Sequence, residues 1–201
     1  METGSIDPNV WGPTFWDLLF YIAINYDNVT QHDNIMQLFS LLESVLPCSD
    51  CRRHYSLFKQ QIPPIQKIKK KDPSAASVWL WVIHDMVNQN IGKICISYEK
   101  LLKKHKSLSC IISDLSIFDS FMFMWFSNSK KEKAKTAIEL IILLLDSIHE
   151  FKVCKVVKNS ITSDWELDKI INCKNEILIF MNFKKQTKDE FIKQYTSSLS
   201  F

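Results

Sequence analysis

Apolar residues in the first half of the chain recur with the spacing of buried helical faces. Between Pro13 and Tyr26 they return every three or four residues, which predicts a helix. The same spacing predicts helices over residues 33–46 and about 49–61, and the prolines after each run would end it. A longer helix is expected from the capping residue Ser74 to Gly92, and a short one over about 97–105. Four amphipathic helices and a short fifth predict a helical bundle.

The pattern in the second half of the chain is less regular. Helices are expected near residues 114–127 and 131–151, whereas the β-branched runs at 153–161 and 176–181 fit either a helix or a strand. The lysine-rich segment 65–73 is expected to be an exposed connector. We therefore predict a mainly α protein with an N-terminal tail (1–9), a helical domain (10–108) and a mostly helical C-terminal domain (109–201).

Composition excludes several classes of protein. The 201 residues are 46% hydrophobic and 23% charged, which is typical of a globular chain and not of a disordered one. Only three glycines are present, so the glycine-rich loops of nucleotide-binding βαβ folds are excluded. The net charge of +3 predicts no general nucleic-acid surface. No apolar stretch approaches the roughly 20 residues that span a bilayer, and residues 1–10 lack the pattern of a secretion signal, so we expect a cytosolic protein without a membrane span.

Cys48 and Cys51 form the one closely spaced pair among six cysteines. They are expected at the start of a helix, where unpaired backbone N–H groups favour thiolate over thiol. This placement indicates a redox centre. Two alternatives remain open from spacing alone: a zinc half-site made by Cys48, Cys51 and His54 with one further ligand, or a pair of inert thiols. Zinc modules usually bring a second close cysteine pair, and the sequence has none.

A second group of chemically capable side chains lies on the predicted helix between Ser74 and Gly92. His84 and Asn88 are one helical turn apart and share a face with Trp81, which would offer an aromatic cofactor two polar groups and an indole plane. The alternative is that His84 and the tryptophans only pack in the core.

Three motifs occur in a fixed order over residues 10–105. They are Trp11-Gly12-Pro13-Thr14-Phe15-Trp16-Asp17-Leu18-Leu19, Pro47-Cys48-Ser49-Asp50-Cys51-Arg52-Arg53-His54-Tyr55, and His84-Asp85-Met86-Val87-Asn88-Gln89-Asn90-Ile91-Gly92-Lys93. Together they resemble the Erv/ALR family of FAD-dependent sulfhydryl oxidases. The likeness is greatest to members encoded by large DNA viruses.

The resemblance implies an Erv-type four-helix bundle plus a short fifth helix. Such a bundle binds FAD noncovalently and pairs as a homodimer through its first two helices. It implies an enzyme that forms disulfide bonds in protein dithiols, a thioredoxin-like carrier among them, and passes electrons to O2 to give H2O2 without a metal. The viral likeness implies that the protein acts in the cytoplasm of an infected host cell or in a virion. The rival hypothesis is a noncatalytic, zinc-stabilised helical adaptor.

The resemblance also assigns roles to individual residues. Cys51 would be the thiol next to the flavin, and Cys48 the outer thiol that exchanges with substrate. Two positions depart from the family pattern, because Phe20 stands where a histidine is common and Asp85 replaces the usual asparagine. The residues expected to bind FAD are Gly12, Thr14, Trp16, His54, Trp79, His84, Asn88, Lys93 and Tyr98.

Some members of this family relay electrons through a second cysteine pair. The cysteines left for such a shuttle are Cys95, Cys110, Cys154 and Cys173, and none of them is closely paired in sequence. Cys154 with Cys173 would be the candidate relay, the alternative being that each is a small buried apolar residue. Residues 109–201 are expected to bind a partner, extend a dimer interface or present substrate.

Overall fold

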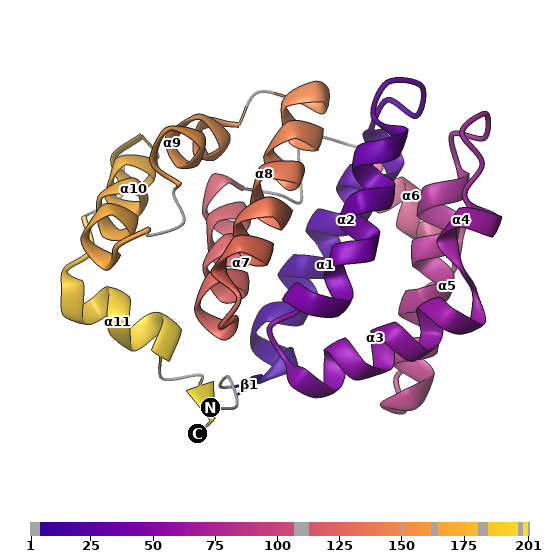
Figure 1. Ribbon diagram of the computed structural model, residues 1–201, viewed down its shortest axis with the longest axis horizontal. Coiled ribbons are helices and arrows are strands. Elements are labelled where there is room, and N and C mark those ends of the chain that lie inside the picture. Colours follow the sequence, from indigo (N-terminus) through magenta and orange to yellow (C-terminus); the bar gives the residue numbers. More distant parts are fainter. Residues whose placement is uncertain are drawn as a thin grey trace.

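The computed structural model describes residues 5–106, 113–149, 151–161, 165–180, 185–196 and 199–200. Within these ranges the protein is mainly α, as the apolar spacing predicts (Figure 1). The elements in chain order are β1 (Ser5–Ile6), α1 (Pro8–Asn25), α2 (His32–Val45), α3 (Ser49–Gln61), α4 (Pro64–Lys67), α5 (Ala75–Asn90), α6 (Tyr98–Lys106), α7 (Asp114–Ser127), α8 (Lys131–Ile148), α9 (Lys152–Ser160), α10 (Leu167–Phe180), α11 (Lys188–Thr196) and β2 (Leu199–Ser200).

The first helix begins earlier than the apolar pattern predicts. Asp7 caps α1, its carboxylate accepting a hydrogen bond from the backbone N–H of Asn9 at 2.8 Å, and Pro8 occupies the first turn. Pro13 therefore lies inside the helix instead of at its start. The extra turn places Trp11 and Gly12 within the helix.

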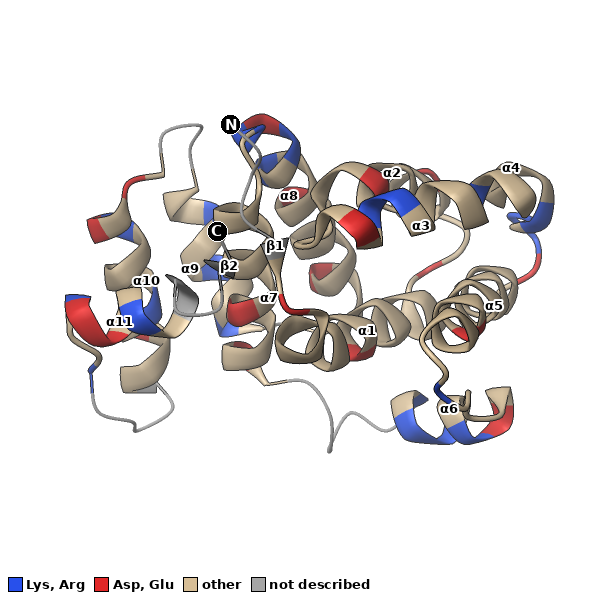
Figure 2. Cartoon of the chain, turned by 90° about the horizontal axis from the view of Figure 1, so that it is seen from below, with Lys and Arg blue, Asp and Glu red and all other residues tan. Residues whose placement is uncertain are grey.

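The helices α1, α2, α3 and α5 form the expected bundle, and the short α6 lies beside α1. Gly92 follows α5 with a φ of 69°, the left-handed conformation that glycine adopts without strain. The segment expected to be a plain connector contains one short helix, α4. Figure 2 marks the lysines near α4 and those of α6 as separate blue stretches of the cartoon.

The second half of the chain is also helical in the ranges described. The β-branched run at 153–161 forms α9, and the run at 176–181 falls in α10 as far as Phe180, with Met181 outside the described residues. Tertiary packing favours the helix here, because Val153, Val156 and Val157 are buried on one face. The two short strands pair antiparallel, with Ser5 opposite Ser200 and Ile6 opposite Leu199.

The two halves of the chain share one hydrophobic core. α7 packs against α1 and α8 against α2, and Figure 1 shows these four helices side by side. Leu38 and Phe39 of α2 belong to the same buried cluster as Ile138 and Ile141 of α8. The boundary at residue 108 remains a prediction, although the contacts join both sides of it. None of the helices in the described ranges is long and apolar enough to cross a membrane.

Replacing Leu38 by alanine should lower the free energy of unfolding by about 2–5 kcal/mol, because the side chain is 0% exposed and its loss leaves a cavity. Leu143 of α8 is 43% exposed, and Leu143→Ala should change that free energy by no more than about 0.5 kcal/mol. Urea denaturation followed by circular dichroism measures both. Equal losses in the two variants would contradict the placement of this core.

Candidate active site

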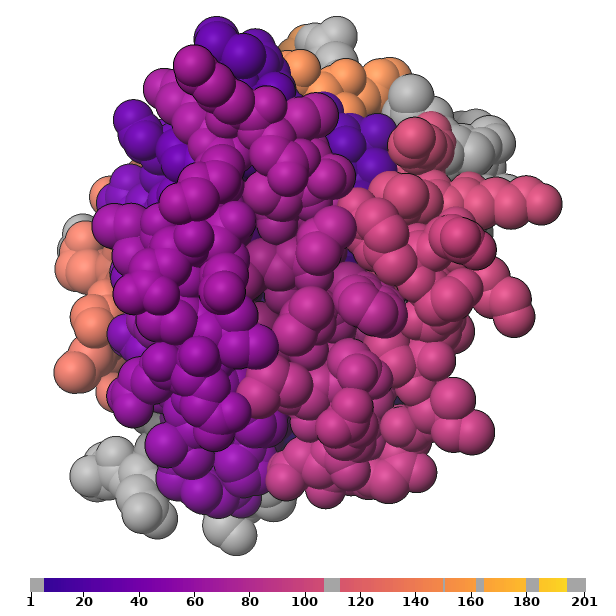
Figure 3. Space-filling model, turned by 90° about the vertical axis from the view of Figure 1, so that its right-hand side faces the viewer, coloured from indigo at the N-terminus to yellow at the C-terminus, as the bar shows by residue number. Residues whose placement is uncertain are grey.

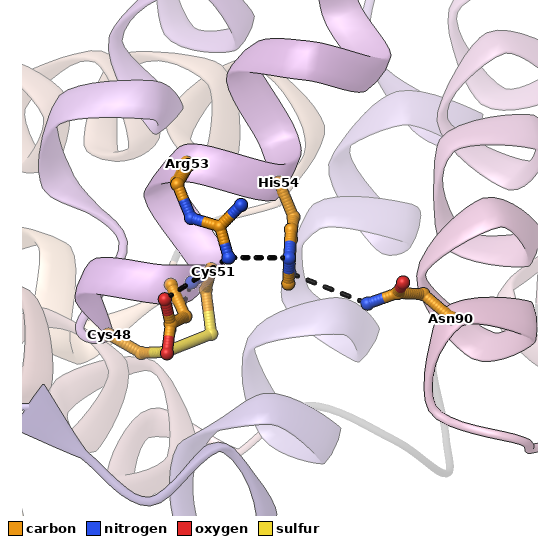
Figure 4. Close-up of polar contacts among 6 residues, drawn as sticks. Cys48, Cys51, Arg53, His54 and Asn90 are labelled. Carbon is orange, nitrogen blue, oxygen red and sulfur yellow. Dashed lines mark hydrogen bonds and ion pairs between the residues drawn. A yellow bond between two sulfur atoms is a disulfide. The ribbon is translucent and has the colours of Figure 1, made fainter.

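The cysteine pair lies at the junction between the end of α2 and the start of α3. Pro47 follows the end of α2, and Cys48 is the N-cap residue of α3 in an extended conformation. The Cys48 and Cys51 side chains form a disulfide (Figure 4). The backbone N–H of Cys51 donates to Cys48 Sγ at 3.1 Å. The two sulfurs are bonded to each other, and no metal-binding group of three or more His, Cys, Asp or Glu occurs in the described part of the chain.

The two cysteines differ in their surroundings. Cys48, which the family resemblance assigns as the outer thiol, is only 5% exposed in this disulfide form. The carbonyl of Pro47 beside it accepts a hydrogen bond from the Ile6 N–H of β1 at 3.1 Å. Cys51 is half-buried and lines a cavity. The pair therefore presents Cys51 to the cavity and keeps Cys48 under cover.

The cavity has a volume of about 410 Å³, within the usual range for small-molecule sites. Its walls come from α1, α3, α5, α6 and the segment after α5, and Figure 3 shows α3 to α6 covering this side of the molecule. Most of its lining is apolar or aromatic, with a few basic and amide groups. Gly12 is buried, yet a Cβ added there would meet nothing within 4 Å, so this glycine leaves open space for a ligand.

Most of the sequence-predicted cofactor residues meet in this cavity. The lining residues among them are Gly12, Trp16, His54, His84, Asn88 and Lys93. Thr14, Trp79 and Tyr98 are not among the lining residues. Trp79 is 2% exposed, stacks on Phe39 with ring centroids 4.9 Å apart, and donates its indole N–H to the Ile62 carbonyl, so it is a packing residue in this structure.

Tyr98 also has a partner outside the cavity. Its hydroxyl lies 2.6 Å from Ser77 Oγ, and this contact ties the start of α6 to α5. Its ring packs at 6.0 Å from Trp81, whose indole N–H donates to the Ile96 carbonyl. Both aromatic residues therefore hold the segment between α5 and α6 in place.

His84 and Trp16 form the aromatic part of the wall. Their ring centroids are 4.4 Å apart. Burial lowers the pKa of His84 to about 4, against smaller raising effects of Asp17 and Asp85, so the ring is neutral at pH 7. His84 Nδ1 is buried without a hydrogen-bond partner. A buried nitrogen in this state is costly, and a ligand in the cavity would relieve the cost.

His54 projects from α3 between two neighbours, as Figure 4 shows. Its Nε2 lies 3.0 Å from the Arg53 guanidinium, and its Nδ1 lies 3.5 Å from the Asn90 amide of α5. These contacts place the imidazole one helical turn from Cys51, on the same wall of the cavity.

Among the lining residues that the sequence did not assign to the site are Asp17, Lys104 and His105. Asp17 Oδ1 accepts from Lys104 Nζ at 2.6 Å and lies 3.4 Å from His105 Nε2. Burial opposes the charged form of Asp17, but hydrogen bonds from His105 and Lys104 outweigh it and lower the pKa of this carboxyl. No sequence signal marks His105, because it follows lysines on an apparently solvent-facing helix yet is only 1% exposed.

The remaining cysteines provide no second disulfide in the described ranges. Cys95, Cys154 and Cys173 are free thiols, whereas Cys110 lies outside the described residues. Cys154 and Cys173 are buried, and burial raises the pKa of both thiols, so each is a poor nucleophile.

Comparison with known proteins gives a consistent result. Residues 13–106 match the model of the Erv1 / Alr family. The chain is 24% identical over 118 residues to FAD-linked sulfhydryl oxidase ERV1 of Arabidopsis thaliana, covering 54% of this chain and 56% of that protein. It is 28% identical over 100 residues to putative FAD-linked sulfhydryl oxidase 347L of Invertebrate iridescent virus 6, covering 44% of this chain and 85% of that protein.

A shorter match, 32% identical over 53 residues, links the chain to putative FAD-linked sulfhydryl oxidase 096R of Invertebrate iridescent virus 3. It covers 25% of this chain and 36% of that protein. The chain therefore spans about half the length of the plant relative and most of one viral relative. No solved structure matches the chain significantly.

The lowered pKa of His84 makes stability depend on pH. The unfolded chain binds a proton at this residue near pH 6.5, whereas the folded chain does so only near pH 4. The stability that the folded chain keeps by holding His84 neutral is therefore fully present above about pH 6.5. The free energy of unfolding falls as the pH is lowered from there toward 4.

When the pH is lowered from 7 to 4.5, the free energy of unfolding of ligand-free protein should fall less in His84→Gln than in the parent protein. Urea denaturation at each pH measures it. The exposed His149, replaced in the same way, is the control. Parallel pH dependence in the parent and His84→Gln would rule out a neutral, buried His84.

Proposed function

Because residues 13–106 belong to the Erv1 / Alr family, we propose that this protein is an FAD-dependent sulfhydryl oxidase that forms disulfide bonds in protein dithiols. One observation carries the proposal: a Cys-x-x-Cys disulfide at a helix N-terminus, with Cys51 on the wall of an aromatic-lined cavity. The catalytic unit would be the predicted domain 10–108. The names of the plant and viral relatives support both the reaction and the cofactor.

The residues of the cavity suit FAD. Trp16 and His84 offer aromatic planes, and Gly12 leaves room beside them. Lys93, whose Nζ contacts the Asn9 amide oxygen at 3.3 Å, offers a cation for a phosphate group. Asn88 and the unpartnered His84 Nδ1 offer hydrogen bonds. When bound, FAD would accept the electron pair released by the dithiol and pass it to O2, which gives H2O2.

The thiol chemistry would be carried out by the protein's own sulfurs. A substrate thiolate attacks Cys48 Sγ, the Cys48–Cys51 bond breaks, and Cys51 leaves as a thiolate facing the cavity. A second substrate thiolate then displaces Cys48 from the mixed disulfide. The substrate leaves as a disulfide, and Cys48 and Cys51 hold the two electrons as a dithiol. The positive end of α3 stabilises both thiolates, and the Cys51 N–H already points at Cys48 Sγ.

Access to Cys48 is a requirement of this scheme. With a side chain only 5% exposed, Cys48 cannot meet a protein thiol until part of its cover moves. β1 runs beside this turn through the Ile6 to Pro47 hydrogen bond, so we propose that substrate binding displaces the N-terminal segment.

The proposed partners are protein dithiols, a thioredoxin-like carrier among them, with O2 as the electron acceptor. A homodimer remains a prediction, and the structure limits the surfaces open to it, because α7 and α8 already cover parts of α1 and α2. The viral relatives support action in the cytoplasm of an infected cell or in a virion. The zinc adaptor stays the alternative hypothesis, and the disulfide between its two proposed cysteine ligands favours the oxidase.

Replacing Cys51 by serine should abolish thiol-dependent oxygen consumption, a loss of at least about a hundredfold, and leave bound yellow flavin in place. The sulfur that receives the electron pair is gone, whereas the aromatic and basic side chains that line the cavity are unchanged. An absorption spectrum and an oxygen electrode with dithiothreitol measure the two properties. Cys154→Ala, a buried cysteine outside the cavity, is the matched control. A colourless Cys51→Ser protein would contradict the separate roles of sulfur and cavity.

His84→Ala should weaken FAD retention about tenfold, because the cavity loses an aromatic plane and a polar group worth roughly 1–2 kcal/mol. Equilibrium dialysis against free FAD measures the change. His149→Ala, at an exposed histidine outside the cavity, should retain FAD like the parent. Unchanged retention in His84→Ala would remove this residue from the cofactor site.

A further inference from the structure

The turn that leads into Cys48 is held by hydrogen bonds from three different parts of the chain. Each of the three consecutive backbone carbonyls before Cys48 accepts one bond, and each donor comes from a different element. The pairs are Asn128 Nδ2 to the Val45 carbonyl at 2.9 Å, Arg52 Nη1 to the Leu46 carbonyl at 2.5 Å, and the Ile6 N–H to the Pro47 carbonyl at 3.1 Å.

The donor from the second half of the chain is Asn128. It is the C-cap residue of α7 and is 7% exposed. Its amide also donates to the Met124 carbonyl of its own helix at 2.8 Å. The side chain therefore links the last turn of α7 to the last residue of α2. We propose that Asn128 is a positioning residue for the Cys48–Cys51 redox centre, an inference that rests on the proposed function.

The position of the Val45 carbonyl explains how the bond from Asn128 affects the position of the two sulfurs. The last carbonyls of a helix have no partner within that helix, so Val45 would be unsatisfied without the Asn128 amide. Three residues later the chain places Cys48 at the N-cap of α3. Cys51 is already fixed in the first turn of that helix. The distance between the two sulfurs therefore depends on how far the backbone at Cys48 can move.

Restricting the turn favours the disulfide over the dithiol. Reduction adds two electrons and two protons, breaks the bond between the two Sγ atoms and leaves two thiols. A turn held at three carbonyls keeps Cys48 near Cys51 after reduction, and the bond reforms readily. Freeing the Val45 carbonyl lowers the effective concentration of one thiol at the other, so the disulfide becomes easier to reduce. The packing of α7 on α1 does not depend on this bond.

The test is the thiol–disulfide equilibrium of Cys48 and Cys51 in Asn128→Ala and Asn128→Asp. Asn128→Asp keeps the shape of the side chain and removes the N–H donor. Ser120→Ala is the matched control, because Ser120 is 1% exposed on the same helix and its hydroxyl bonds only within α7, to the Ser116 carbonyl at 2.9 Å. Full-length protein is equilibrated in buffers of reduced and oxidised dithiothreitol, alkylated and analysed by mass spectrometry.

Both Asn128 variants should shift the equilibrium about fivefold to tenfold toward the dithiol, where tenfold corresponds to about 30 mV. Ser120→Ala should match the parent. Folded Asn128 variants with the parent equilibrium would overturn the proposal, as would failure of both variants to fold, which would make Asn128 a residue of general stability. The readout needs neither FAD nor turnover, so failure of the proposed oxidase activity would be seen separately in the oxygen assay.

Discussion

The hydrogen bond from the Cys51 N–H to Cys48 Sγ holds both sulfurs at the N-terminal end of α3. Pro47 prevents α2 from continuing, and the residue after it becomes the cap of α3. A sulfur in the cap position meets the positive end of the helix, and the second sulfur, one turn on, faces the cavity. Every other feature of the site is arranged around this turn.

Several polar groups interrupt the mostly apolar and aromatic lining of the cavity. His84 and His105 each keep a buried ring nitrogen without a partner, and Asp17 beside them holds Lys104. Such groups reduce stability unless something in the cavity satisfies them. Gly12, which has no side chain, leaves empty space in the lining of the same cavity. The protein therefore gives up stability at the place where a planar, polar ligand would restore it.

Spacing of apolar residues was enough to predict the bundle, because α2 and α5 each bury several residues at helical spacing. It placed the start of α1 too late, since the capping side chain of Asp7 lies outside the apolar pattern. The cavity residues with motif neighbours, such as His54 and Asn88, were predictable. His105 and Asn128 were not, because each acts on a part of the chain far away in sequence, and only tertiary packing brings them there.

The shared core changes how the second half of the chain is best understood. A domain that merely follows the bundle would leave α1 and α2 with a free apolar face, and the expected homodimer would need that face. In this chain α7 lies on α1 and α8 on α2, so the chain itself buries parts of those surfaces. The same docking brings Asn128 to the turn before Cys48. Covering the bundle and holding the turn before Cys48 are thus two results of one packing arrangement.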